Sequence, residues 1–216
     1  MPSTPARKRV AVLISGRGSN MAALIEAAKN DTYPAEIVVV VSNDPTAKGL
    51  AYAATQGVPT AAVDHRSFGK NREAFERALQ RELETHGIEL ICLAGFMRLL
   101  TPWFVRQWDG RMLNIHPALL PAFKGLDTHA RAIAAGAKRH GATVHFVVPE
   151  MDAGPIIVQE AVPVLAGDTE AALAARVLEV EHRIYPLALK LVAEGRIRVE
   201  GGRCLIDGQP APLIPR

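Results

Sequence analysis

Cysteine and aromatic residues are scarce in this chain of 216 residues. Only two cysteines occur, Cys92 within an apolar run and Cys204 near the end, so a framework of disulfides is not expected. Phe, Trp and Tyr together make up 5% of the residues, which leaves few rings on which single-stranded bases could stack. These shortages argue against a disulfide-stabilised secreted domain and against a nucleic-acid-binding protein.

Long apolar runs and dense runs of one charge are also missing. The longest apolar stretches, such as 37–41 and 90–94, are too short to cross a bilayer, and the N-terminus lacks the apolar core of a signal peptide. We therefore expect a cytoplasmic protein without a membrane partner. The 25 basic residues are scattered among 22 acidic ones, and the net charge of +3 fits small anionic substrates better than nucleic acid.

Two kinds of catalytic signature are absent as well. Neither H-E-x-x-H nor C-x-x-C spacing occurs, so we expect no metal. A G-x-S-x-G elbow is missing too, which argues against a serine hydrolase.

Strands alternate with helices along the whole chain. Short apolar runs predict strands at 9–15, 37–41, 60–63, 88–94, 111–115, 142–148 and 156–164, with a hairpin at 197–199 and 203–206. Helical spacing predicts helices at 21–28, 47–56, around 96–108, and at 71–86, 127–135 and 169–194, the last with Pro186 inside it. The pattern predicts an α/β, Rossmann-like open sheet, parallel in the N-terminal half and mixed toward the C-terminus, with helices on both faces. We expect one domain, 1–216.

Ligands of open α/β sheets bind beyond the carboxyl ends of the strands, so the residues after each strand are the candidates. Four such segments are unusual and are expected to line one crevice: 16–20, 95–100, 114–117 and 149–155. The first is a glycine-rich turn before a helix, where exposed amides favour an anion such as a phosphate. A tight turn that merely needs glycine is an equally good interpretation. The third glycine of a dinucleotide motif is replaced by Met21, which argues against a pyrophosphate cofactor.

Asn114 and His116 are alternate residues of one strand and therefore project to the same face. A carboxamide beside an imidazole suits the stabilisation of an oxyanion and the handling of a proton. Asp152, which follows another strand, could pair with His116 and favour the imidazolium form. A structural asparagine and a surface histidine are the alternative. We expect His145 to be a packed core residue, and His65, His86, His129 and His140 to lie in loops or at the surface.

Five stretches together resemble the folate-dependent formyltransferases, in particular those that act on glycinamide ribonucleotide. They are 14–20, 93–98, 113–121 with N-I-H-P-A-L-L-P, 144–147, and 151–156 with M-D-A-G-P-I. The resemblance covers nearly the whole chain. It implies transfer of the formyl group of 10-formyltetrahydrofolate to the amine of N1-(5-phospho-D-ribosyl)glycinamide, in purine synthesis. The chain departs from the family pattern at Arg17, at Ala118 and in the turn 122–124, which leaves the local shape of these loops open.

The resemblance also implies a role for each candidate residue. Asn114, His116 and Asp152 would be catalytic. The phosphate and ribose would be held by Arg17, Gly18, Ser19 and Asn20, with Glu181 near the glycinamide end. The folate would be bound by Arg72, Met97, Arg98, Leu99, Leu100, Asn114, Val148, Pro149, Glu150, Met151 and Asp152. Without the resemblance, Arg72 and Glu181 would be assigned to solvated helix faces, and Met97, Leu99 and Leu100 to the core.

Other functions remain open at this point. A 10-formyltetrahydrofolate hydrolase would use a similar Asn, His and Asp set but has no evident need for the glycine-rich turn. A formyltransferase of initiator tRNA would require an additional nucleic-acid-binding domain. A non-catalytic phosphosugar-binding protein would leave Asn114, His116 and Asp152 without a purpose. For the formyltransferase acting on glycinamide ribonucleotide we expect small-molecule substrates, no nucleic acid, and a monomer or weak homodimer.

Overall fold

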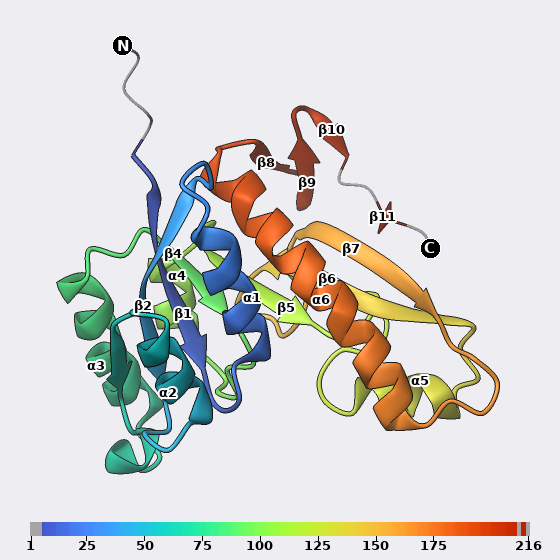
Figure 1. The fold of residues 1–216 in the computed structure, drawn as a ribbon, viewed down its shortest axis with the longest axis horizontal. Helices are drawn as coiled ribbons and strands as arrows, with labels where there is room; N and C mark the ends of the chain where they lie inside the picture. The colour runs from blue at the N-terminus through green and yellow to red at the C-terminus, as the bar shows by residue number, and fades with distance from the viewer. Residues whose placement is uncertain (1–5, 211–212, 215–216) are drawn as a thin grey trace. The chain divides into compact units, whose positions relative to one another are not determined.

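The computed structural model describes residues 6–210 and 213–214, and the chain divides into two compact units, Met1–Leu113 and Asn114–Arg216 (Figure 1). Each unit is built around strands that are covered by helices.

The first unit contains four parallel strands in the order β4-β1-β2-β3. Their bounds are Lys8–Ile14 for β1, Ala35–Ser42 for β2, Thr60–Ala62 for β3 and Leu90–Leu93 for β4. The side chains from Val10 to Ile14 are 0% exposed. A continuous apolar run is what a strand requires when both faces of the sheet are covered.

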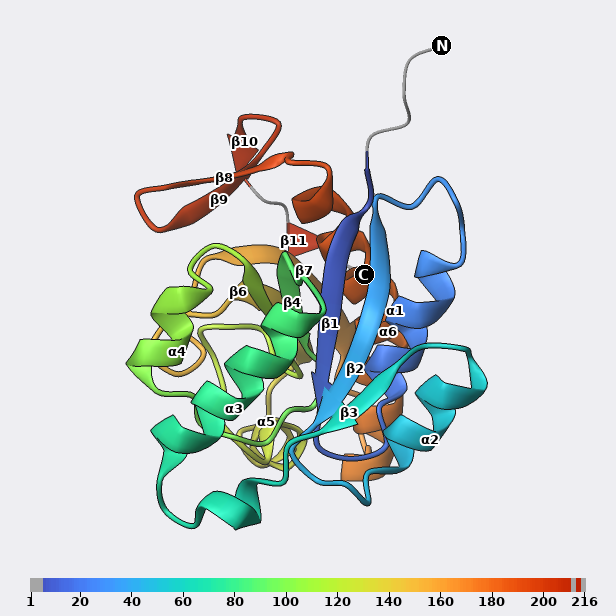
Figure 2. The same ribbon diagram turned by 90° about the vertical axis from the view of Figure 1, so that its left-hand side faces the viewer.

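The helices of the first unit are α1 (Ser19–Ala28), α2 (Lys48–Thr55), α3 (Arg72–Thr85), α4 (Pro102–Gln107) and the 3-10 helix η1 (His65–Phe68). Figure 2 shows α1 and α2 on one face of the strands and α3 and α4 on the other. Capping side chains define where several of them begin: Asn71 accepts the N–H of Ala74 at α3, and Thr101 accepts that of Phe104 at α4.

Strand β5 (Met112–His116) crosses the boundary between the units at residues 113 and 114. The second unit continues with β6 (Arg139–Phe146) and β7 (Ile156–Pro163), which pair antiparallel, and with β11 (Leu213–Ile214), which pairs parallel to the edge of β7. The change from parallel to antiparallel pairing makes the sheet mixed.

Two helices and a small second sheet complete the second unit. Helix α6 (Glu170–Ala193) packs on β6, β7 and α5 (Thr128–Ala134) and buries Val177, Ile184 and Leu189. Pro186 lies inside α6, as the sequence predicts. The second sheet has the order β10-β9-β8, with bounds Ile197–Glu200 for β8, Arg203–Ile206 for β9 and Gln209–Pro210 for β10.

The α/β class and the mixed sheet are confirmed, and two predicted elements need correction. The expected helix around 96–108 is limited to α4, and residues 95–101 are irregular. Strand β6 begins at Arg139, three residues before the expected start at 142, so His140 is a strand residue with 0% exposure. The expectation of a loop or surface position for His140 was therefore wrong. No helix in the described part of the chain is long and apolar enough to span a membrane.

Candidate active site

Asn114, His116 and Asp152 lie together in the second unit. The two β5 residues are separated by Ile115, so their side chains share one face of the strand. His116 Nδ1 lies 3.4 Å from Asp152 Oδ2, and His116 Nε2 lies 3.0 Å from the carbonyl oxygen of Phe123. The imidazole and carboxylate are 6% and 11% exposed, so their interaction is only weakly screened by water. The imidazole therefore faces an acceptor at each nitrogen.

His145 connects the asparagine to the acid. Its Nδ1 lies 2.8 Å from the carbonyl oxygen of Phe146 and must carry the proton of that hydrogen bond. Burial lowers the pKa of His145, so the ring is neutral near pH 7 and its Nε2 is an acceptor. The Asn114 amide donates to this Nε2 at 3.2 Å, which fixes the orientation of the carboxamide and leaves its second N–H for another acceptor. Asp152 Oδ1 lies 3.8 Å from the same Nε2.

The loop after β6 places Asp152. Asp152 itself has a backbone φ of 50°, a left-handed conformation that Asp tolerates better than most residues. The loop is closed by a hydrogen bond of 3.0 Å from Phe146 N–H to Pro155 O. A Cβ at Gly154 would lie 1.8 Å from Phe146 O, so only glycine allows the two backbone segments to approach this closely. Val148, Pro149, Glu150 and Met151, the expected folate contacts of this loop, precede the acid, and Met151 is 58% exposed.

The segment after His116 is held by polar side chains of β6 and β7. The Thr143 hydroxyl donates to Ala118 O at 2.6 Å and accepts the Leu120 N–H at 3.2 Å, while Gln159 donates to Leu120 O at 2.9 Å. Further along, Gly125 N–H donates to Asp152 Oδ2 at 2.8 Å. Both the imidazole and the acid are thus tied to the same stretch of backbone.

The glycine-rich turn in the first unit has the geometry expected of an anion site. Gly18 adopts φ of 73° at the N-cap of α1, which begins at Ser19. Gly49 approaches from α2: its N–H donates to Gly16 O at 3.0 Å, and a Cβ there would lie 2.5 Å from Ile14 Cδ1. The first turn of α1, with Ser19 and Asn20, therefore directs backbone N–H groups toward the turn.

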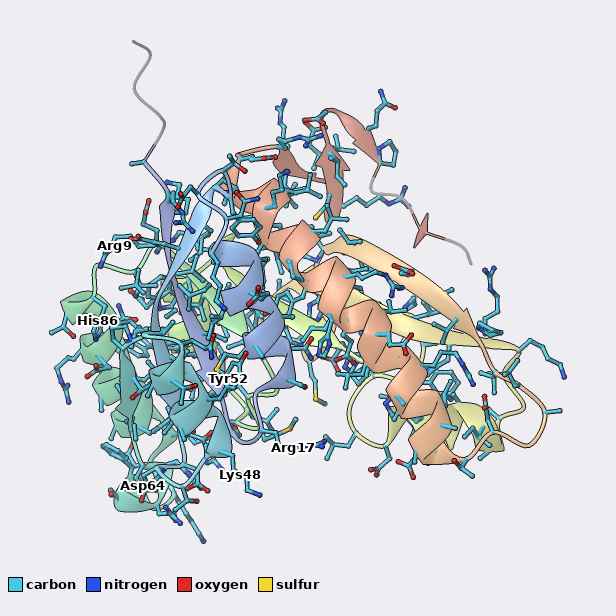
Figure 3. The ribbon with its side chains drawn as sticks, in the orientation of Figure 1. Arg9, Arg17, Lys48, Tyr52, Asp64 and His86 are labelled. Atoms are coloured by element: carbon cyan, nitrogen blue, oxygen red, sulfur yellow. The ribbon has the colours of Figure 1, made fainter. Side chains whose placement is uncertain are left out.

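Two cations flank this turn. Arg17 belongs to it, and Lys48 precedes Gly49 at the start of α2; both are exposed. Figure 3 labels both at the end of the first unit toward which β1 runs. Their charges favour an anion at this end of the unit.

The predicted folate segment of the first unit, residues 95–101, is irregular and alternates in exposure. Met97 and Leu99 are 67% and 65% exposed, so assigning them to the core would have been wrong, and Arg98 and Leu100 are half-buried. Ser15 Oγ accepts the N–H of Met97 at 2.7 Å and donates to Asn43 Oδ1. Exposed apolar side chains on a fixed backbone are typical of a ligand-binding edge.

Two expected site residues on helices differ in burial. Arg72 is exposed at the start of α3, whereas Glu181 on α6 is 8% exposed and not part of a solvated face. Among the residues that the structure describes, no group of three or more His, Cys, Asp or Glu side chains could hold a metal ion.

Sequence reasoning missed two sets of residues. His145 is buried, as expected, but also contacts Asn114 and Asp152. The sequence did contain a signal for these contacts: Thr143 and His145 are alternate residues of β6, so two polar side chains share one face of that strand. Ser15, Asn43 and His65 form a chain at the carboxyl ends of β1 and β2, in which His65 Nδ1 lies 2.8 Å from Asn43 O. Of these three, only His65 was singled out from the sequence, as a loop or surface residue.

A family model described as formyl transferase matches residues 8–189. The chain belongs to the formyl transferase family. It is 44% identical to the phosphoribosylglycinamide formyltransferase of Escherichia coli K12, over 94% of this chain and 95% of that protein. It is 53% identical to the trifunctional purine biosynthetic protein adenosine-3 of Gallus gallus over 90% of this chain, and spans only 19% of that longer protein.

Solved structures of formyl transferases agree with this assignment. Glycinamide ribonucleotide transformylase 1 from Symbiobacterium toebii superposes with a TM-score of 0.92 at 44% identity, covering 95% of this chain and 97% of that one. A formyltetrahydrofolate deformylase from Pseudomonas syringae reaches a TM-score of 0.87 at 27% identity, covering 94% of this chain and 66% of that one. The higher identity and coverage favour the transformylases.

Proposed function

We propose that this formyl transferase moves the formyl group of 10-formyltetrahydrofolate to the amine of N1-(5-phospho-D-ribosyl)glycinamide, in de novo purine synthesis. The observation that carries the proposal is the cluster of Asn114, His116 and Asp152, which is suited to acyl transfer. The likeness to the Escherichia coli and Symbiobacterium enzymes over almost the full length of each supports the choice of substrates.

In the proposed reaction the glycinamide amine attacks the formyl carbon of the folate, and the carbonyl oxygen becomes an oxyanion. The free N–H of Asn114 donates to this oxygen, and the Nδ1–H of His116, whose contact with Asp152 is long, donates to it as well. The distance from His116 Nδ1 to Asp152 is 3.4 Å, longer than a charge-assisted hydrogen bond of about 2.8 Å. The Nδ1 proton can therefore be donated to the oxyanion without breaking a strong bond to Asp152. The C–N bond to folate N10 then breaks. A water held by Asp152 carries the proton from the amine to N10, giving the formylated product and tetrahydrofolate.

The remaining assignments concern binding. The amides at Gly18, Ser19 and Asn20, with Arg17, hold the ribose phosphate, and Glu181 lies near the glycinamide. The folate is bound by Arg72, Met97, Arg98, Leu99, Leu100, Asn114, and by residues 148–152. In this scheme the single domain 1–216 holds the phosphate with its first half, while its second half supplies the catalytic residues and completes the folate site. We propose that it acts in the cytoplasm as a monomer or weak homodimer.

Hydrolysis of 10-formyltetrahydrofolate is the second candidate, because the deformylase shares the fold. Water would then replace the amine at the same three residues. The glycine-rich turn at the start of α1 favours the transferase, since a hydrolase needs no phosphate site. The two candidates differ in one measurable property, the dependence of folate release on the amine.

The test is to mix the purified protein with 10-formyltetrahydrofolate and follow tetrahydrofolate release with and without glycinamide ribonucleotide. The transferase predicts release only when the amine is present, in equal amounts with formylated product. Release at the same rate without the amine would identify a hydrolase. Binding of the phosphorylated substrate without any release of folate would identify a non-catalytic binding protein.

A further inference from the structure

A buried carboxylate on α3 is bonded to one residue of the folate segment. Glu76 is 1% exposed, in the middle of a helix whose other face is rich in charge. Its Oε1 accepts the N–H of Thr101 at 2.6 Å, and its Oε2 accepts the Thr101 hydroxyl. Both oxygens therefore act as acceptors for the same residue. Burying a charge is costly, so an apolar residue would serve simple packing better.

The position of Thr101 gives this contact a consequence for the ligand site. Thr101 ends the irregular segment 95–101, which is also fixed at Met97 by the hydrogen bond from its N–H to Ser15 Oγ at 2.7 Å. The exposed apolar side chain of Met97 is at one of these attachment points, and that of Leu99 lies between them. Fixing an irregular segment at two points limits the conformations that it can adopt.

The same carboxylate lies one helical turn after Arg72, the first residue of α3. Residues four apart lie on the same face of a helix, so Glu76 and Arg72 project from one side of α3. The bond from Glu76 to Thr101 therefore sets the position of the Arg72 end of α3 relative to the segment that carries Met97 and Leu99.

Packing between α3 and α4 does not depend on Glu76 alone. The Trp108 indole N–H donates to Gln80 Oε1 at 2.8 Å, and the Arg77 guanidinium lies 4.5 Å from the centre of the Trp103 ring. These contacts hold α4 itself. Among these three α3 residues, Glu76 is the one that contacts the segment 95–101, which precedes α4.

We propose that Glu76 is a positioning residue for the folate site: through Thr101 it holds the segment 97–100 and Arg72 in the spacing that the folate requires. The inference rests on the proposed function. Glu76 itself does not touch the substrate. Loss of the Glu76 carboxylate therefore weakens folate binding. It has little effect on binding of the phosphorylated substrate or on the rate of the catalytic step.

The experiment compares Glu76→Ala with Gln80→Ala, a matched control that removes the neighbouring tie between α3 and Trp108. For Glu76→Ala we expect the KM for 10-formyltetrahydrofolate and the Kd of the folate, measured by quenching of intrinsic fluorescence, to rise about tenfold. The KM for glycinamide ribonucleotide should stay within about twofold and kcat within about threefold. Gln80→Ala should leave all four values within about twofold.

A conservative variant adds a second readout. In Glu76→Gln the amide oxygen can accept the Thr101 N–H while its NH2 donates to the rotated Thr101 hydroxyl, so we expect the folate KM to return to within about threefold of the parent. Thr101→Val replaces the hydroxyl with a methyl group, which removes its bond to Glu76 and also the cap of α4 at Phe104. It serves if Glu76→Ala does not fold, with an expected rise in folate KM of about threefold.

A positioning role is overturned if Glu76→Ala changes the folate KM no more than Gln80→Ala does, or if it raises both KM values equally. A parent protein without amine-dependent transfer would contradict the proposed function instead. In that case the folate Kd of parent and variant still tests the role of Glu76 directly.

Discussion

His116 has two ring nitrogens with different surroundings, one beside Asp152 and one beside a backbone carbonyl. This arrangement could be predicted in part from the sequence, because alternate strand residues share a face and Asp152 follows a second strand. The tie between Asn114 and neutral His145 could not, because alternation on β6 predicts burial without saying what a buried ring contacts. The Thr143 and Gln159 bonds likewise join residues far apart in the chain.

Replacing His116 with alanine tests its proposed role in catalysis. We expect kcat to fall at least about a hundredfold, since the variant loses a donor to the oxyanion and a group that handles the proton. The dissociation constant of glycinamide ribonucleotide, measured by calorimetry, should change by less than about threefold because the glycine-rich turn is intact. Turnover close to that of the parent would contradict the proposed role.

At the scale of elements, the parallel strands and the helices were predictable because the apolar runs are uninterrupted and the helical stripes are regular in this chain. The start of β6 was not. Arg139, His140 and Gly141 have the composition of a turn, yet Gly141 is needed because a Cβ there would lie 2.1 Å from Glu160 O on β7. A glycine inside a strand can thus signal close approach of a neighbouring backbone as well as a turn.

The early start of β6 buries an ionisable ring and gives the second unit a dependence on pH. Burial, together with the nearby His129 and His116 rings, lowers the pKa of His140 to about 4. The ring of His129 lies 5.2 Å away, and burial lowers its pKa as well. In the unfolded chain a histidine titrates near 6.5. Protonation therefore favours the unfolded state, and stability that is complete above pH 6.5 is lost as the pH falls toward 4.

Chemical denaturation at pH 7 and pH 5 measures this effect. We expect His140 to account for a loss in the free energy of unfolding on the order of 2 kcal/mol between these two pH values. His140→Phe cannot be protonated, so its free energy of unfolding should depend less on pH by that amount. An equal pH dependence in parent and variant would show that His140 does not titrate on unfolding.

At the scale of the whole molecule, the even composition of the chain gave no sign of the division at residues 113 and 114, because the boundary falls inside a strand. Each unit contains one buried cysteine. Cys92 on β4 is 0% exposed, and Cys204 on β9 is 3% exposed with a pKa raised by burial to about 11. Thiolates react and thiols do not, so each unit must open before its cysteine is modified.

Labelling with an alkylating reagent at pH 8, with each cysteine followed by mass spectrometry, therefore reports on the opening of each unit. Cys204 lies in a small sheet of short strands outside the residues that the family model matches, whereas β4 pairs with β1 in a buried parallel sheet. Regions with fewer buried contacts open at lower free energy. We expect Cys204 to be labelled at least about tenfold faster than Cys92 in the native protein, and both rapidly in denaturant. Equal, slow labelling of the two thiols would show instead that the small sheet opens only when the whole chain unfolds.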